Sequence, residues 1–132
     1  MIKVLSLTTR SRCEFHDISQ KVRDVVRESK VDNGLCHIFV PHTTAAVTIN
    51  ENADPSVQSD ILNGLEKLAP REARYAHSEG NASAHIKSSV IGVEKCVLVE
   101  GGQLKLGTWQ AIYFCEFDGP RHRNYYINVQ KD

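Results

Sequence analysis

The sequence predicts a single α+β domain that spans residues 1–132. Three observations support this class. Strand-like apolar patterns occupy the start of the chain and its last forty residues, segments with helical spacing lie between them, and Gly101-Gly102 and Gly119-Pro120 supply tight turns. Strands in antiparallel groups with intervening helices favour an α+β fold over a doubly wound α/β fold. No linker, low-complexity tract or internal repeat divides the chain, so a second domain is not expected.

The first two elements follow from local periodicity. Residues 2–10 have the pattern of a strand, and residues 17–30 have the pattern of an amphipathic helix. The apolar positions of this helix share one face: Ile18, Val22, Val25 and Val26. Asp17 or Ser19 is available as its N-cap, and Asn33-Gly34 is expected to end it.

Two strands and a second helix occupy the middle of the chain. The strands are expected at residues 35–41 and 43–50, with Pro41 marking an edge or a bend between them. The helix is expected at residues 54–70, with Ser56 as its cap. Its apolar positions lie at helical spacing: Val57, Ile61, Leu65 and Leu68.

The last third of the chain is predicted to be a short helix followed by a meander of strands. The helix covers residues 82–92 and is ended by Gly92. The strands are expected at residues 94–100, 103–109, 110–118 and 122–130. One face of the final strand is dry and includes Arg123, Tyr125, Ile127 and Val129, and the other is wet and includes Asn124, Tyr126, Asn128 and Gln130. Trp109 is expected to pack in the core.

Composition excludes several classes of function. Sixteen basic residues balance sixteen acidic ones, so no global field attracts nucleic acid or an anionic membrane, and any anion site must be local. No apolar run approaches the roughly 20 residues of a membrane span, and the N-terminus reads as a strand rather than a signal peptide. The four cysteines form no C-x-x-C pair. Free thiols of this kind suggest a reducing compartment, so we expect a cytoplasmic protein without nucleic-acid or membrane partners.

Three segments contain more polar chemistry than the fold requires. In the first, His42 follows Pro41, and Glu51 and Asp54 lie beyond the next strand. Asp54 is explained equally well by the turn that begins the second helix, because aspartate favours turns. Nothing in a turn calls for an imidazole, so His42 is the stronger candidate.

The second segment places His77 and His85 around a short "EGNAS" loop, with Asn81 and Lys87 nearby. The separation of the two histidines matches neither a helical zinc pair nor a zinc finger. Their neighbourhood of an acid, an amide and a cation strengthens the case for a site. The alternative for Lys87 is a solvated position on a helix.

The third segment follows the Gly119-Pro120 turn and contains Arg121 and Arg123. A guanidinium group binds phosphate or carboxylate in a bidentate manner. Surface arginines are as readily explained by solvation or by pairing with acids, and Asp118 by turn chemistry. The glycines near residue 101 do not form G-x-G-x-x-G, so no nucleotide loop is expected.

These three segments together resemble a known family. "HTTAAVTINENADPSVQSDI", "HSEGNASAHIKSS" and "LKLGTWQAIYFCEFDGPRHR" are similar to the signatures of the YjbQ-like family, described as having secondary thiamine-phosphate synthase activity. The resemblance implies an α+β fold with a sheet curved on itself, as a sandwich or a half-barrel with two or three helices, and a homotrimer. It also implies that one pocket is surrounded by His42, Glu51, His77, Asn81, His85 and Arg121.

The function implied by this resemblance is the coupling of a pyrimidine-methyl diphosphate to a thiazole phosphate with release of diphosphate. The residues assigned to catalysis are His42, Glu51, His85 and Arg121, and those assigned to substrate binding are Asn81, Lys87 and Arg123. The alternative is a metal- or phosphometabolite-binding trimer without significant turnover. Both readings use the same pocket, so the sequence does not separate them.

A divalent metal, zinc or magnesium, is a further expectation. Three neutral imidazoles, those of His42, His77 and His85, would form with a water the open tetrahedral arrangement of a catalytic zinc site. The competing arrangement is a metal-free pocket in which the same histidines bind a phosphate.

Overall fold

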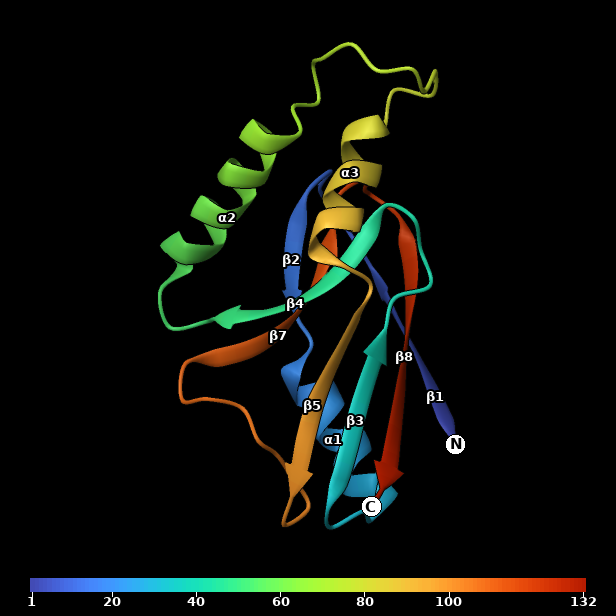
Figure 1. The fold of residues 1–132 in the computed structure, drawn as a ribbon, viewed down its shortest axis with the longest axis vertical. Coiled ribbons are helices and arrows are strands. Elements are labelled where there is room, and N and C mark those ends of the chain that lie inside the picture. Colours follow the sequence, from blue (N-terminus) through green and yellow to red (C-terminus); the bar gives the residue numbers. More distant parts are fainter.

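The computed structural model describes all 132 residues and contains eight strands and three helices (Figure 1). In chain order these are β1 (Ile2–Thr8), β2 (Glu14–Asp17), α1 (Ser19–Ser29), β3 (Gly34–Phe39), β4 (Ala45–Glu51), α2 (Pro55–Leu68), α3 (Ala82–Ile91), β5 (Glu94–Glu100), β6 (Gln103–Leu104), β7 (Gln110–Glu116) and β8 (His122–Lys131). One sheet has the strand order β1-β8-β3-β5-β6, and the other has the order β2-β7-β4. Every pairing is antiparallel.

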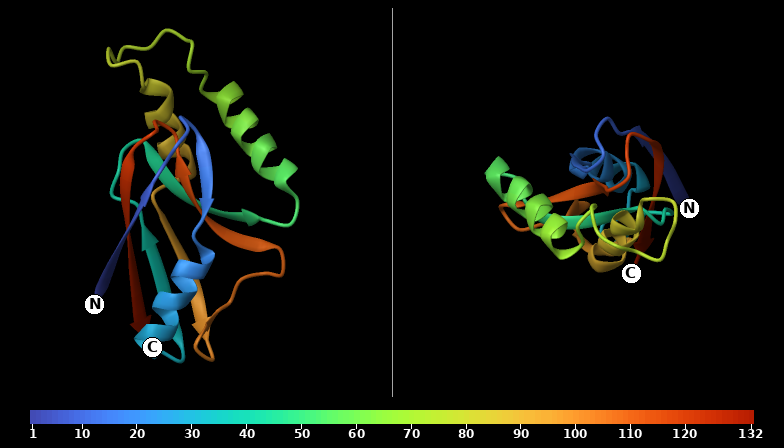
Figure 2. Two further views of the ribbon diagram at one scale, coloured as in Figure 1. Left: turned by 180° about the vertical axis from the view of Figure 1, so that it is seen from behind. Right: turned by 90° about the horizontal axis from the view of Figure 1, so that it is seen from above.

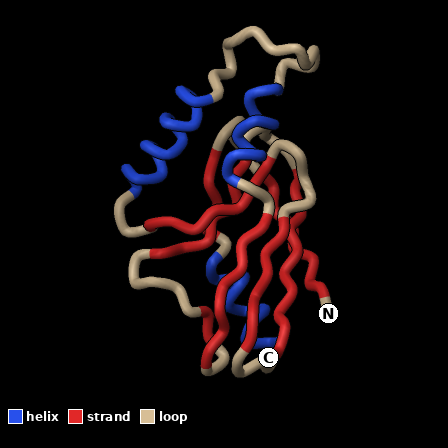
Figure 3. Tube along the Cα trace, in the orientation of Figure 1, coloured by secondary structure: helices blue, strands red, loops and turns tan.

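The two sheets form a curled half-barrel. The long strands β1, β8, β3 and β5 lie side by side, while β4 and β7 cross one end of them (Figure 1). Helix α1 lies behind the five-stranded sheet in Figure 1 and in front of it in the reverse view of Figure 2, and no helix covers the opposite face. Helices α2 and α3 lie at the same end as β4 and β7 and are joined to each other by a long loop (Figure 3). The predicted α+β class and curved sheet are therefore confirmed.

Helix α1 forms where its apolar spacing predicts, and its side chains Val22, Val25 and Val26 are buried. The carboxylate of Asp17 accepts a hydrogen bond from the backbone N–H of Ser19 at 2.9 Å, so Asp17 satisfies one amide at the start of the helix. The helix lies within the predicted residues 17–30, but it is ended by Lys30, which adopts a left-handed conformation with φ 58°, and not by Asn33-Gly34.

Gly34 begins β3 instead of ending the first helix. A Cβ atom at this position would lie 1.9 Å from the carbonyl oxygen of Gln130 in β8. The glycine therefore permits the close approach of the two strands.

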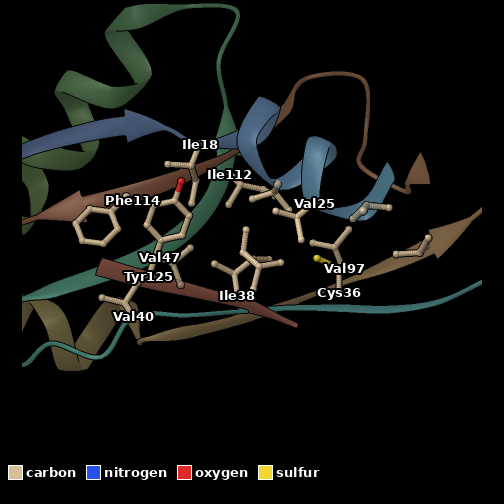
Figure 4. Close-up of a cluster of buried hydrophobic side chains, with 14 of the residues drawn as sticks. Ile18, Val25, Cys36, Ile38, Val40, Val47, Val97, Ile112, Phe114 and Tyr125 are labelled. Atoms are coloured by element: carbon tan, nitrogen blue, oxygen red, sulfur yellow. The ribbon is translucent and has the colours of Figure 1, made fainter. Parts of the chain in front are cut away.

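Two hydrophobic clusters form the core. The larger one lies between α1, the inner face of the five-stranded sheet and one face of the three-stranded sheet, and it includes Ile18, Ile38, Val47, Ile112, Phe114 and Tyr125 (Figure 4). The smaller one lies under α2 and α3 on the other face of the three-stranded sheet, and it includes Ala46, Leu65, Ala84, Tyr113 and Phe117. Strand β7 is buried on both faces, which explains its almost continuous apolar sequence.

The predicted C-terminal meander is wrong. In a meander β7 would pair with β6 and β8 with β7. Instead, β7 pairs with β2 and β4 in the second sheet, and β8 lies between β1 and β3 in the first. The strand expected at residues 103–109 contains only Gln103–Leu104. Trp109, expected in the core, is 62% exposed. The short strand β2 was not anticipated.

Helices α2 and α3 occupy the predicted segments with two differences in detail. The N-cap of α2 is Asp54 rather than Ser56, because the Asp54 carboxylate accepts from the Ser56 N–H at 2.9 Å. Of the expected apolar stripe only Leu65 is fully buried, and Leu68 is exposed. Helix α3 ends as predicted at Gly92, whose φ is 93°. Neither of these helices, nor α1, is long and apolar enough to cross a membrane.

Candidate functional site

A cavity of about 600 Å³ lies where three segments meet: the β3–β4 connection, the start of α3 and the β7–β8 turn. These segments lie together in the upper half of the molecule as drawn in Figure 1. The polar residues that line the cavity are His42, Thr43, Thr44, Glu79, Asn81, His85, Asp118, Arg121 and Arg123. Segments far apart in the sequence therefore contribute to one site.

His42 completes the hydrogen bonding of β8. Strand β3 pairs with β8 as far as Phe39, opposite Tyr126, and the chain then turns away at Pro41. The imidazole Nε2 of His42 lies 3.0 Å from the backbone nitrogen of Asn124 and 3.1 Å from its carbonyl oxygen. The side chain thus replaces the next residue of a strand partner.

The surroundings of His42 favour its neutral form. Burial, and secondly the charge of Arg123, lower the pKa of His42 below its ordinary value. In the neutral ring, Nε2 either accepts the Asn124 N–H, with the proton on Nδ1, or donates to the Asn124 carbonyl oxygen, with Nδ1 as an acceptor. No side chain or backbone group of the protein bonds to Nδ1, so in the first of these tautomers its N–H is a donor for a ligand.

The β7–β8 turn is tied to the start of α3 by Asp118. The Asp118 carboxylate accepts from Asn81 Nδ2 at 2.9 Å and from Arg121 Nη2 at 3.0 Å. Burial alone would raise the pKa of Asp118, but these hydrogen bonds outweigh it and the pKa is lowered. The turn contains a cis Gly119-Pro120 bond, and a Cβ atom on Gly119 would lie 2.2 Å from the Ser11 carbonyl oxygen. The turn therefore requires glycine.

Arg121 keeps hydrogen-bonding capacity for a ligand. Its Nε donates to the Asp118 carbonyl oxygen at 2.8 Å and its Nη2 to the Asp118 carboxylate. The guanidinium carries five N–H groups, and the side chain is 51% exposed at the cavity. The remaining donors are available to an oxyanion.

Arg123 is bound differently. Its Nε donates to Glu116 Oε1 at 2.8 Å, and its Nη2 donates to Glu116 Oε2 and, at 2.9 Å, to Thr44 Oγ1. The side chains of Arg123 and Glu116 are 5% and 0% exposed. Thr9 donates a further hydrogen bond to Glu116 at 2.7 Å. Arg123 thus forms a wall of the cavity, with its donors largely satisfied inside the protein.

Glu116 was not identified from the sequence. Burial favours its neutral form, but the hydrogen bonds from Arg123, Thr9 and the Asp118 N–H lower its pKa overall, so it stays ionised. A carboxylate inside the apolar run of β7 was the available signal, because a buried charge needs a partner.

The first turn of α3 borders the cavity through Asn81 and His85. Asn81 is the N-cap residue, and its carbonyl oxygen accepts from the N–H groups of Ala84 and His85. The first amides of a helix have no intrahelical acceptor, and the helix dipole favours negative charge at this end. His85 therefore lies beside a region of positive potential.

Three predicted residues, Glu51, Lys87 and His77, do not line the cavity. Glu51 is at the far end of β4, opposite Gln110 of β7. Lys87 is 3% exposed, and its Nζ lies 2.7 Å from Glu66 Oε1 of α2. Two residues along a helix correspond to roughly 200° of rotation, so Lys87 faces away from the side of α3 that carries His85. Lys87 is also not the solvated helix residue that was the alternative.

The three histidines predicted as metal ligands do not converge. The rings of His77 and His85 meet edge to face, with their centroids 5.2 Å apart, while His42 contacts Asn124. His77 Nε2 lies 3.6 Å from Glu79 Oε2, and His77 is not among the lining residues. No group of three or more histidine, cysteine, aspartate or glutamate side chains is arranged to hold a metal ion. A three-histidine zinc site therefore does not fit this arrangement.

The site brings together His42, Asn81, His85, Arg121 and Arg123 of the predicted residues. The half-exposed Arg121 guanidinium and the N-terminus of α3 are donors suited to an oxyanion, and so is His42 when its proton is on Nδ1. Glu79 and Asp118 add carboxylates at the same cavity. The arrangement can bind a phosphate group and leaves two acids to interact with a cation or with donors on the ligand.

Known proteins resemble the chain over nearly its whole length. The family model described as "UPF0047 protein YjbQ-like" matches residues 3–132. UPF0047 protein MJ1081 of Methanocaldococcus jannaschii is 47% identical over 135 residues, which cover 100% of this chain and 98% of the relative. UPF0047 protein YugU of Bacillus subtilis is 48% identical over 130 residues, covering 98% of each.

Solved structures agree with this relationship. A crystal structure of a YjbQ/UPF0047 family protein from Clostridium acetobutylicum is similar with a TM-score of 0.95 at 49% identity, covering 97% of this chain and 99% of the other. A YbjQ-like protein of Sulfolobus solfataricus has a TM-score of 0.96 at 32% identity, covering 100% and 97%. The chain therefore belongs to the UPF0047 (YjbQ-like) protein family.

Proposed function

We propose that this protein is a transferase of the secondary thiamine-phosphate synthase type, which couples a pyrimidine-methyl diphosphate to a thiazole phosphate. The observation that carries the proposal is the convergence of His42, His85 and Arg121 on one open cavity from the β3–β4 connection, helix α3 and the β7–β8 turn. Donors gathered in this way suit a phosphorylated small molecule. The described activity of the family supplies the reaction.

The proposed chemistry consists mainly of stabilising a leaving group. The C–O bond to the pyrimidine-methyl carbon breaks, its electron pair leaves with diphosphate, and the thiazole nitrogen forms the new C–N bond. Negative charge develops on the departing oxygen, and donors fixed beforehand stabilise it. The His42 Nδ1–H and the Arg121 guanidinium are the candidates for this role, and His85 is placed beside them. Holding the two substrates in line supplies the rest of the acceleration.

Of the two metals considered, Mg²⁺ fits the cavity better than Zn²⁺. Mg²⁺ prefers carboxylate and phosphate oxygens, which Glu79 or Asp118 and the diphosphate would supply. When bound, it would neutralise part of the diphosphate charge. We expect equal zinc content in untagged wild-type protein and in His85→Ala, because the histidines do not converge. Stoichiometric zinc lost only from the variant would contradict this assignment.

A binding protein without significant turnover is the second candidate. It is favoured by the internal pairing of both arginines, Arg121 with Asp118 and Arg123 with Glu116, which reduces the net positive charge available to a leaving group. Such a cavity would still hold a phosphometabolite through hydrogen bonds.

A homotrimer remains part of the proposal. The uncovered face of the five-stranded sheet exposes Ile2, Val4 and Leu98, and β1 has a free edge. Exposed apolar groups and free strand edges are usually covered by a partner. Light scattering that gave a monomer mass over a broad concentration range would refute the trimer. The four free cysteines suit the reducing cytoplasm, which we propose as the location.

Two measurements on one preparation separate the candidates. Coupling is followed by the appearance of thiamine phosphate against a control without protein, and pyrophosphate binding is followed by calorimetry. Turnover together with binding supports the transferase. Binding without turnover supports the binding protein. Absence of both would refute the assignment of this cavity to phosphorylated ligands.

A further inference from the structure

We propose that Phe39 is a specificity-determining residue that stacks on the ring of a phosphorylated substrate, so that the cavity selects planar, ring-bearing phosphates over phosphates alone. This inference rests on the proposed function and deepens it. It assigns the recognition of the ring to a residue that the sequence did not indicate.

Phe39 is held as a platform at the end of β3. Its ring stacks on that of Tyr126 in the neighbouring strand β8, with centroids 6.2 Å apart and an interplanar angle of 29°. Despite this contact Phe39 is 42% exposed. A large aromatic side chain exposed to this degree and supported from one side presents its other side to whatever occupies the adjoining space.

The adjoining space is the cavity. Phe39 lines it together with Val40, Pro41 and Val93, so one part of the lining is apolar. Exposed apolar residues elsewhere on the same sheet face, such as Leu98, do not line it. The platform therefore belongs to the site and not only to the general apolar surface.

The spacing fits one ligand with two ends. Phe39 and His42 are three residues apart, so their Cα atoms lie at most about 10 Å from each other. The phosphate donors His42 and Arg121 line the same cavity as Phe39. A ring joined to a phosphate through one methylene is the kind of molecule that meets both ends at once.

Four probes test the inference by calorimetry: pyrophosphate, methyl phosphate, cyclohexylmethyl phosphate and benzyl phosphate. We expect wild-type protein to bind benzyl phosphate about tenfold more tightly than methyl phosphate, since aromatic stacking contributes roughly this factor. Cyclohexylmethyl phosphate should fall between them, because it buries apolar area without stacking. Phe39→Ala should bind benzyl and methyl phosphate equally, and Phe39→Tyr should retain the preference.

Controls separate stacking from other roles of Phe39. Leu98→Ala removes an exposed apolar side chain from the same sheet face and should preserve every affinity. Pyrophosphate affinity should be unchanged in Phe39→Ala. If this variant weakens pyrophosphate as much as benzyl phosphate, or dissociates the assembly, Phe39 belongs to an interface between copies and the inference is wrong.

The ligand series also separates the role of Phe39 from the proposed function. Wild-type protein that binds pyrophosphate but shows no preference for benzyl over methyl phosphate would overturn the role of Phe39 and leave the proposed function intact. Equal affinities for benzyl and cyclohexylmethyl phosphate would likewise overturn stacking. Protein that binds none of the four probes would overturn the proposed function, and this inference with it.

Discussion

The imidazole Nε2 of His42 lies 3.0 Å from the backbone nitrogen of Asn124 and 3.1 Å from its carbonyl oxygen, so a side chain from the β3–β4 connection completes the edge of β8. A ring held in this way has a fixed orientation. His42 therefore both lines the cavity and supports the pairing of β8. Changes at His42 are therefore expected to affect both.

We expect His42 to titrate below its ordinary pKa of 6.5, because burial and the charge of Arg123 disfavour the protonated ring. The folded protein then binds fewer protons than the unfolded chain as the pH falls past 6.5. The contribution of His42 to stability is complete above that pH and is lost as the pH falls through the folded-state pKa. An NMR titration of the histidine ring protons measures it. A midpoint at or above 6.5 would contradict the assignment.

The buried Arg123–Glu116 pair should contribute more to stability than the Arg121–Asp118 pair. Removal of Arg123 leaves a fully buried carboxylate without its main partner, so we expect Arg123→Ala to lower the free energy of unfolding by about 3 kcal/mol. Arg121 is half exposed, and Arg121→Ala should cost less than about 1 kcal/mol. Urea unfolding of the two variants gives the comparison. Equal losses would show that the burial of the first pair does not matter.

Much of the fold was predictable because it is determined locally. The spacing of Val22, Val25 and Val26 specifies a helix with one buried face, and Gly92 ends α3 by adopting a conformation that other residues avoid. The assignment of strands to sheets was not predictable. A run such as that of β7 indicates a buried strand, yet it contains no information about which neighbour it pairs with.

The site was predictable in part for the same reason. His42 and Arg121 are polar residues that the local structure does not require, and they reach the cavity. Lys87 does not line the cavity, because the rotation of a helix relative to its surroundings depends on packing. Phe39 was overlooked, since an aromatic residue in a strand usually indicates a core position. Only the structure shows that its ring is half exposed beside the cavity.

The ion pair between α2 and α3 should respond unequally to removal of its two members. Glu66→Ala leaves the Lys87 ammonium, which is 4% exposed, without an acid partner, and we expect a loss of about 2 kcal/mol in the free energy of unfolding. Lys87→Met keeps the aliphatic chain and removes the buried charge, so it should cost less than about 1 kcal/mol. Both variants should bind pyrophosphate as tightly as wild type, because Lys87 faces away from the cavity. Weaker binding in Lys87→Met at unchanged stability would restore Lys87 as a ligand residue.

Turnover should depend on the three residues that converge on the cavity. We expect His42→Ala, His85→Ala and Arg121→Ala each to reduce coupling of the pyrimidine diphosphate to the thiazole phosphate by at least about tenfold, or roughly 1.4 kcal/mol of transition-state stabilisation. Asn128→Ala, on the uncovered face of β8 and outside the cavity, is the matched control and should have little effect.

Each variant must be shown to be folded by circular dichroism, because a loss of activity through unfolding carries no chemical information. This check matters most for His42, which also supports β8. A variant that binds pyrophosphate normally but turns over slowly has lost an interaction made in the transition state. One that loses both has lost the phosphate site. Full activity in all three folded variants would mean that the convergence of His42, His85 and Arg121 has a structural origin, and the transferase proposal would then lose its main support.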